Sequence, residues 1–122
     1  MNIVIILPTY NERENIAGMI HALQSEFPKI PHRMNILVVD DNSPDGTADV
    51  VRAEGRNNPN VFLLSGSKEG LGAAYIRGMK HAVDRLQADA VMEMDADFSH
   101  KPEDVPRLLN SLDAGADFVI GS

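Results

Sequence analysis

Two carboxylates separated by a single residue, Asp95 and Asp97, directly follow an apolar run at residues 90–94. Such a run predicts a buried strand, and ligands of α/β proteins bind at the carboxyl ends of strands. Mg²⁺ and Mn²⁺ prefer oxygen ligands, and Mg²⁺ is commonly held by one or two carboxylates together with substrate phosphates. The pair is therefore a candidate metal site, with an ordinary surface turn as the alternative because Asp is common in turns.

Three further apolar runs also end in polar, turn-forming residues. The runs cover residues 3–7, 36–39 and 61–64, and the polar segments that follow them cover residues 8–12, 40–43 and 65–68. In a parallel sheet all strand carboxyl ends meet at one edge, so these segments are expected to lie together with Asp95 and Asp97. We therefore expect a ligand site at that edge.

Helical periodicity separates the apolar runs along the whole chain. Asn11 and Glu14 have the spacing of a capping box, and Pro8 is expected to end the first strand. The sequence also predicts a helix at about residues 47–56, a helix that begins at residues 101–103, and a fifth strand at residues 116–120. The expected apolar helix faces are Ile16, Met19, Ile20, Leu23 and Phe27; Leu71, Tyr75, Met79, Ala82, Val83 and Leu86; and Val105, Leu108, Leu109 and Leu112. Strict alternation of strand and helix predicts one Rossmann-like α/β domain over residues 1–122, with a mostly parallel sheet and helices on both faces.

The composition excludes several classes of function. The chain has 122 residues, 43% of them hydrophobic and 24% charged, with a net charge of −7. It carries no block of Lys and Arg, which argues against nucleic acid as a partner. It contains no Cys, and no apolar run approaches the roughly 20 residues of a membrane span. We therefore expect a cytoplasmic protein, whose membrane contact would be peripheral at the cytoplasmic face.

Local motifs discriminate among nucleotide sites. Gly70-Leu71-Gly72 matches only half of a dinucleotide-binding fingerprint, and the chain has no P-loop string. A phospho-acceptor receiver domain would need the Asp40-Asp41 pair after its first strand, not its second. A nucleotide-sugar site fits better, because carboxylates accept hydrogen bonds from ribose and base.

In that site Asp95 and Asp97 would hold a cation against a diphosphate, while Asp41 and the backbone near Pro8 and Tyr10 would face base and ribose. Each of three other side chains at this edge has two possible roles, one in ligand binding and one in the structure. Tyr10 can stack on the base or fill the edge of the core. Glu12 can accept a hydrogen bond from the base or serve as a favourable charge in the first turn of a helix. Lys68 can reach a phosphate or remain solvated.

Four segments together resemble one known family. Residues 8–16, 39–47, 70–82 and 94–102 closely resemble the dolichyl-phosphate (polyprenyl-phosphate) mannosyltransferases of glycosyltransferase family 2, which have the GT-A fold. The resemblance implies that the donor is GDP-mannose, with UDP-glucose as the main competitor. It implies that the acceptor is a polyprenyl phosphate and that the cofactor is Mg²⁺ or Mn²⁺.

The resemblance also assigns roles to individual residues. Ser99 stands where some relatives carry a metal-reaching Gln, and Asp97 is the residue expected to be catalytic. The attacking phosphate oxygen is already anionic near neutral pH, so no general base is named. The positions matching nucleotide contacts are Pro8, Tyr10, Glu12, Val39 and Asp41, and those matching the metal and diphosphate site are Asp95, Ala96 and Asp97.

Members of this family are considerably longer than this chain. We therefore expect residues 1–122 to be the nucleotide-binding, amino-terminal half of the fold. The alternative from another class is a non-catalytic nucleotide-binding or assembly fragment. An incomplete sheet would expose an apolar edge, so we expect a homo-oligomer.

Overall fold

The structure, a computed structural model, describes residues 1–66, 71–99, 101–107, 109 and 118–120. Its centre is a parallel sheet of five strands in the order β3-β2-β1-β4-β5. The strands are β1 (Asn2–Thr9), β2 (Arg33–Asp40), β3 (Val61–Ser65), β4 (Ala90–Glu93) and β5 (Phe118–Ile120). The expected parallel α/β sheet is confirmed, and of the expected fifth strand, residues 118–120 lie within the described part.

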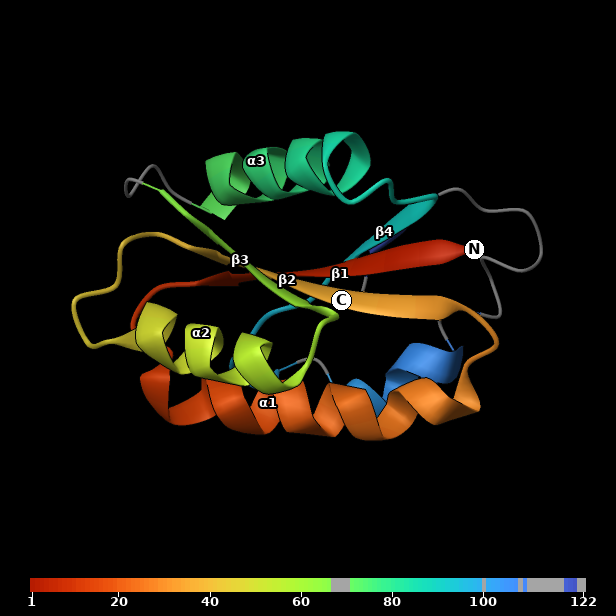
Figure 1. Ribbon diagram of the computed structural model, residues 1–122, viewed down its shortest axis with the longest axis horizontal. Coiled ribbons are helices and arrows are strands. Elements are labelled where there is room, and N and C mark those ends of the chain that lie inside the picture. The colour runs from red at the N-terminus through yellow and green to blue at the C-terminus, as the bar shows by residue number, and fades with distance from the viewer. Residues whose placement is uncertain (67–70, 100, 108, 110–117, 121–122) are drawn as a thin grey trace.

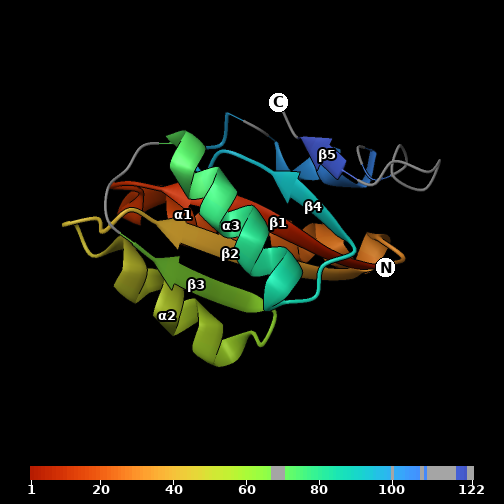
Figure 2. The same cartoon turned by 90° about the horizontal axis from the view of Figure 1, so that it is seen from above.

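Helices cover both faces of the sheet (Figure 1). One face carries α1 (Arg13–Glu26) and α2 (Thr47–Asn57), and the other carries α3 (Leu71–Asp84). A 3₁₀ turn at Pro102–Asp104 opens the helical segment expected there, and that turn packs beside α1. Seen from above, α3 crosses β1 and β2 (Figure 2).

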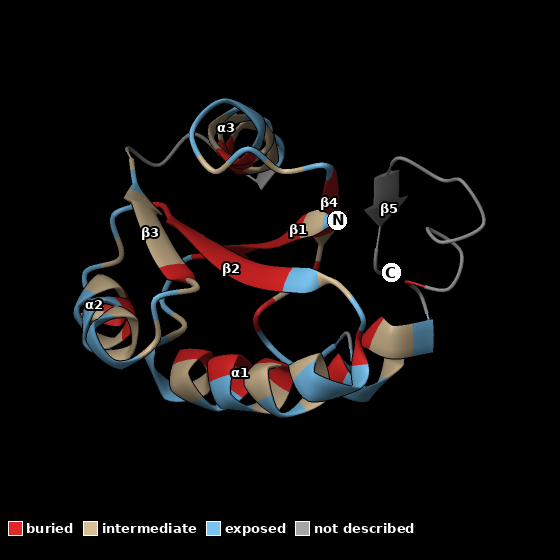
Figure 3. Cartoon of the chain, turned by 45° about the vertical axis from the view of Figure 1, so that its right-hand side comes forward, coloured by how far each residue is buried: buried red, intermediate tan, exposed pale blue. Residues whose placement is uncertain are grey.

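The central strands are buried on both faces, which is why their sequences are continuously apolar (Figure 3). Beneath α1 and α2, the strand residues Ile3, Ile5 and Leu7 join the larger of two core clusters. Beneath α3, Val4 and Ile6 join the smaller one. Four of the five residues expected on the apolar face of α1 are fully buried, and each contributes about 2 kcal/mol of hydrophobic stabilisation; these are Ile16, Met19, Ile20 and Leu23. The fifth, Phe27, lies beyond α1 in a 3₁₀ turn and packs on the core only partly buried.

Pro8 does not end the first strand, which continues to Thr9. Successive residues of a parallel strand bond to alternate sides, so Pro8 faces the β4 side, as Ile6 does. The pairing between β1 and β4 ends where Ile6 meets Glu93. Pro8 therefore has no ladder partner that needs its missing N–H, and a proline is tolerated there.

Two other local expectations were wrong. The N-cap of α1 is Glu12, not the expected Asn11, and Glu12 makes no side-chain capping hydrogen bond. On α3 the side chain of Val83 is exposed, and Leu86 lies beyond the end of the helix although it still packs on the core. Val105 and Leu109 are buried as expected, whereas Leu108 and Leu112 lie outside the described residues.

Gly78 lets α3 approach the sheet closely. A Cβ at this position would lie 2.9 Å from Cγ2 of Ile6 and 3.0 Å from Cγ2 of Val39. Real Cβ atoms rarely come so near, because protein interiors are packed at close to crystal density. The close approach keeps the first turns of α3, which carry Tyr75 and Arg77, near the carboxyl ends of β4 and β2.

Candidate functional site

The carboxyl ends of the strands meet at one edge of the sheet, as expected for parallel strands (Figure 2). The β1 and β2 ends are joined there by the hydrogen bond from the Asp41 N–H to the Thr9 carbonyl, 3.0 Å long. The β3 end joins them through the Gly66 N–H, which donates to the Asp40 carbonyl at 3.0 Å. Three consecutive neighbours in the sheet therefore present their polar ends as one connected surface.

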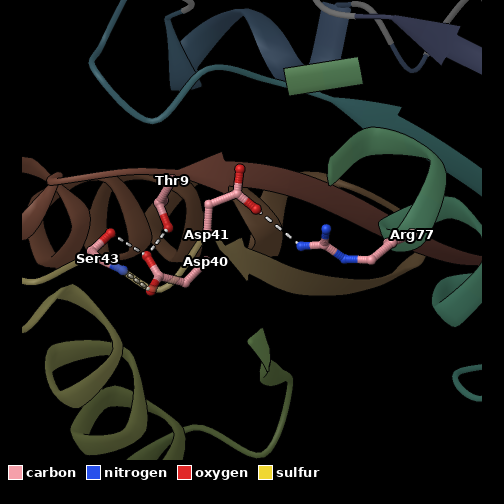
Figure 4. A network of polar contacts seen from close by, with 5 residues as sticks. All are labelled: Thr9, Asp40, Asp41, Ser43 and Arg77. Carbon is pink, nitrogen blue, oxygen red and sulfur yellow. Dashed lines mark hydrogen bonds and ion pairs between the residues drawn. The ribbon is translucent and has the colours of Figure 1, made fainter. Parts of the chain in front are cut away.

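Asp40 is held by a dense set of hydrogen bonds (Figure 4). The Thr9 hydroxyl donates to its Oδ1 at 2.7 Å, and Ser43 donates twice, from its hydroxyl to Oδ1 at 2.6 Å and from its N–H to Oδ2 at 2.9 Å. Asp40 is only 1% exposed. Its carboxylate is therefore solvated by the protein itself, and its role is to fix the loop after β2.

Asp41, the residue expected to face base and ribose, points the opposite way from Asp40 (Figure 4). Its Oδ1 accepts a hydrogen bond from Nη2 of Arg77, on α3, at 3.0 Å. Only 9% of the Asp41 side chain is exposed. A carboxylate buried to this extent needs a counter-charge, and Arg77 provides it.

The loop after β2, together with Thr47 at the start of α2, holds the backbone at the start of α1. The N–H groups of Asn11, Glu12 and Arg13 donate respectively to Oγ of Ser43 (2.9 Å), Oγ1 of Thr47 (3.1 Å) and Oδ2 of Asp45 (3.2 Å). The expected capping box fails because Asn11 has a φ of 56°, in the left-handed region, and the loop after β2 takes over the capping role. The hydrogen bond from the Thr47 hydroxyl also holds the pKa of the Asp45 carboxyl below its ordinary value.

Asp95 and Asp97 lie in the turn after β4 and share Ser99 as a donor. The Ser99 N–H donates to Oδ1 of Asp97 at 3.0 Å, and its hydroxyl to Oδ2 of Asp95 at 3.3 Å. The phenol of Tyr75, on α3, donates to Oδ1 of Asp95 at 3.2 Å. Burial, followed by the charge of Asp95, raises the pKa of Tyr75 far above its ordinary value, so the phenol remains a donor at any physiological pH.

The donor set of this turn fits a hard divalent cation only with ligand oxygens added. Within the described ranges, no group of three or more His, Cys, Asp or Glu residues is arranged to hold a metal. Two carboxylates bridged by one serine match the minimal protein contribution to a Mg²⁺ site, in which phosphates and water complete the shell. Asp97 is exposed and Asp95 half-buried, so both are accessible from solvent.

The other predicted site residues occupy different environments. Tyr10 is 41% exposed beside the site, and the half-buried Glu12 accepts from Nδ2 of Asn15 at 3.2 Å. Pro8, Val39 and Ala96 are buried, so a ligand would have to meet them mainly through the backbone. Lys68 lies outside the described residues. The nucleotide contacts expected of these residues therefore remain predictions.

Sequence reasoning missed four residues that organise the site: Thr9, Thr47, Tyr75 and Arg77. Tyr75 was predicted only as part of the apolar face of its helix, and no hydrogen-bonding role was predicted for its hydroxyl. The acidic partner of Arg77 is 36 residues away along the chain, so no local spacing could reveal it. A search for cationic or hydroxyl residues on the helix covering the acidic edge would have found both.

The structure places no helix of membrane-spanning length and hydrophobicity anywhere in its described portion.

Comparison with known proteins gives consistent matches. Residues 4–122 match the model of "Glycosyl transferase family 2". The chain is 43% identical to undecaprenyl-phosphate mannosyltransferase from Micrococcus luteus, over 100% of this chain and 48% of the relative. It is 44% identical to polyprenol monophosphomannose synthase from Mycolicibacterium smegmatis, over 98% and 44%. The chain thus spans less than half the length of these two curated relatives.

Solved structures agree on the fold. Mannosyl-3-phosphoglycerate synthase from Rubrobacter xylanophilus aligns with a TM-score of 0.73 and 27% identity, over 92% of this chain and 36% of that one. A Pyrobaculum calidifontis mannosyltransferase in complex with GDP-Man and Mn²⁺ aligns with a TM-score of 0.53 and 25% identity, over 66% and 24%. The expected GT-A architecture is confirmed, and the chain belongs to glycosyl transferase family 2.

Proposed function

We propose that this chain is the donor-binding part of an inverting glycosyltransferase that moves mannose from GDP-mannose to a polyprenyl phosphate. The observation that carries the proposal is the shared Ser99, which links the carboxylates of Asp95 and Asp97 at the sheet edge that also holds Asp41. The names of the relatives favour mannose and a polyprenyl phosphate acceptor.

Each part of this edge has a distinct task in the proposed reaction. Asp41 accepts hydrogen bonds from the nucleoside, and Tyr10 offers a ring beside it. Asp95 and Asp97 are the residues that would hold the cation beside the diphosphate. When bound, Mg²⁺ or Mn²⁺ offsets the charge on the departing nucleoside diphosphate. Ser99 and Tyr75 keep the two carboxylates in place by donating to them.

The acceptor phosphate is the nucleophile. Its oxygen is anionic near neutral pH, so attack on the anomeric carbon needs no protein base to remove a proton. What the protein must supply is orientation of the donor sugar and exclusion of water as a competing nucleophile. In this proposal membrane contact is peripheral and follows the lipid acceptor at the cytoplasmic face. Homo-oligomer formation remains a prediction.

Calorimetric titration of the chain with GDP and with UDP, with and without Mn²⁺, tests the proposal. The expected result is binding that requires Mn²⁺ and is tighter for GDP than for UDP. Tighter binding of UDP would instead favour a UDP-glucose-dependent relative. Absence of binding with either nucleotide would contradict a donor site in these residues.

A turnover assay distinguishes an active glycosyltransferase from the alternative, a non-catalytic nucleotide-binding or assembly fragment. Mannosyl transfer from GDP-mannose to a short polyprenyl phosphate by the chain itself would support a complete catalytic unit. Metal-dependent GDP binding without transfer would support a nucleotide-binding or assembly fragment.

A further inference from the structure

We propose that Arg77 is a positioning residue that orients Asp41 for the nucleoside, and that Gly66 is required to leave room for the Arg77 guanidinium. The consequence for ligand binding rests on the proposed function. The structural relation among the three residues does not.

The contact between Arg77 and Asp41 joins helix α3 to the carboxyl end of β2. Arg77 lies on α3, above the sheet, and Asp41 follows β2, within it (Figure 4). Nη2 of Arg77 is 3.0 Å from Oδ1 of Asp41, and 26% of the Arg77 side chain and 9% of the Asp41 side chain are exposed. An ion pair shielded from water is much less weakened by salt and solvent than an exposed pair.

The pair also fixes how the Asp41 carboxylate is presented to a ligand. Because Nη2 of Arg77 holds Oδ1, the orientation of the carboxylate toward a nucleoside hydroxyl or N–H group is set before the ligand arrives. Asp40 contributes little to this orientation, since its carboxylate points away toward Thr9 and Ser43. Arg77 therefore acts on the ligand through Asp41.

The backbone of Gly66 lies directly against the guanidinium of Arg77. A Cβ at this position would lie 2.7 Å from Nη2 and 2.8 Å from Cζ of Arg77, closer than Cβ contacts occur. The Gly66 N–H is itself fixed by the Asp40 carbonyl at 3.0 Å, so the backbone there cannot easily retreat. The guanidinium is the far end of a flexible side chain, so adding a methyl group would displace Arg77 from Asp41 and leave the fold intact.

The test is a double-mutant cycle on GDP affinity in the presence of Mn²⁺, with Arg77→Gln, Asp41→Asn and the double variant. Each single variant is expected to weaken binding about tenfold, and the double variant to bind no more weakly than Asp41→Asn alone. Arg77→Lys should restore part of the affinity because it keeps the charge. Additive losses would overturn the proposal, since Arg77 would then act independently of Asp41.

A matched ion pair serves as the control for the cycle. Arg52 and Asp49 also form an Arg–Asp contact, 2.9 Å long, but it lies on the exposed surface of α2. Arg52→Gln and Asp49→Asn change the net charge as the test variants do and should leave GDP affinity within about twofold. A comparable loss in these controls would mean that overall charge, and not positioning, explains the effect.

Gly66→Ala tests the steric part, with Gly72→Ala as its control because a Cβ on Gly72 would meet nothing within 4 Å. The Gly66 variant is expected to lose affinity to the same extent as Arg77→Gln while its melting temperature changes little. Unchanged affinity in Gly66→Ala would overturn the requirement for glycine.

A readout without nucleotide separates failure of this inference from failure of the proposed function. In NMR spectra of the unliganded chain, the guanidinium N–H signals of Arg77 should exchange slowly with solvent. They should exchange faster in Asp41→Asn and in Gly66→Ala, but not in Gly72→Ala. If GDP does not bind but these signals behave as expected, the proposed function fails and the positioning stands. If the signals do not respond to Asp41→Asn, the positioning is overturned.

Discussion

The ends of β2 and β4 carry similar acidic residues but hold them very differently. After β2, Asp40 and Asp41 are 1% and 7% exposed, and four hydrogen bonds from Thr9, Ser43 and Arg77 reach their carboxylates. After β4, Asp97 is exposed and Asp95 is half-buried, and Ser99 and Tyr75 are among the groups that donate to them.

This difference indicates that the carboxylates at the two strand ends have different roles. The β2 carboxylates are already solvated by protein, so the geometry there is fixed before any ligand arrives, which reduces the entropy lost on binding. The β4 carboxylates keep access to solvent, which a metal site requires because water and phosphate must complete its coordination. Loss of Asp40 at the β2 end should therefore mainly lower stability, whereas loss of Asp97 at the β4 end should mainly weaken ligand binding.

The largest expected effect on binding comes from Asp97→Ala. Loss of one of the two carboxylates proposed to bind the cation should reduce Mn²⁺-dependent GDP affinity by at least about a hundredfold. The free energy of unfolding should change little, since the variant relieves repulsion between neighbouring carboxylates without opening a cavity. Calorimetry and urea denaturation measure the two quantities. Asp49→Ala, an exposed carboxylate on α2, is the control, and unfolding of the Asp97 variant would show that Asp97 is structural.

Asp40→Ala should give the opposite pattern. It leaves the Thr9 hydroxyl and the Ser43 N–H without their acceptor in a buried place, which should lower the free energy of unfolding by about 3 kcal/mol. Urea denaturation of this variant and of Asp49→Ala provides the measurement. A loss as small as that of the exposed control would remove the distinction drawn between the two strand ends.

Tyr75→Phe should have an intermediate effect on binding. The variant keeps the ring that packs on the core but removes the hydroxyl that orients Asp95, so Mn²⁺-dependent GDP affinity should fall about tenfold. Stability should be nearly unchanged. If affinity is also unchanged, the phenol is not part of the support of the metal site.

The smallest effect concerns acid stability at the β2 end. The hydrogen bond from Thr47 lowers the pKa of Asp45 in the folded state below 3.8, the ordinary value. Its stabilising contribution is therefore fully present above that ordinary value and disappears as the pH falls through the lower folded-state pKa. The stability difference between the native chain and Asp45→Asn should shrink between neutral pH and about pH 3. Urea midpoints at both pH values measure it, and a difference that grows on acidification would contradict the sign.

The sequence predicted the sheet well because its central strands are buried on both faces and their sequences are therefore unbroken apolar runs. Local signals failed where tertiary contacts took over a local role. Asn11 and Glu14 have the spacing of a capping box, but the caps of α1 come from the loop after β2. The same applies to the candidate site: the spacing of Asp95 and Asp97 along the chain singled them out as candidates, whereas Arg77 meets Asp41 only after α3 has packed on the sheet.

The capping of α1 by a distant loop also has a consequence for how the chain folds. A helix of 14 residues is marginal in water on its own, and α1 lacks a side-chain cap of its own to help nucleate it. Its first N–H groups find acceptors only when the loop after β2 is in place, more than 30 residues along the chain. The start of α1 and the loop after β2 therefore form one cooperative folding unit. The amide protons of Asn11, Glu12 and Arg13 should open together in hydrogen exchange, and their common rate would report on the integrity of the acidic edge as a whole.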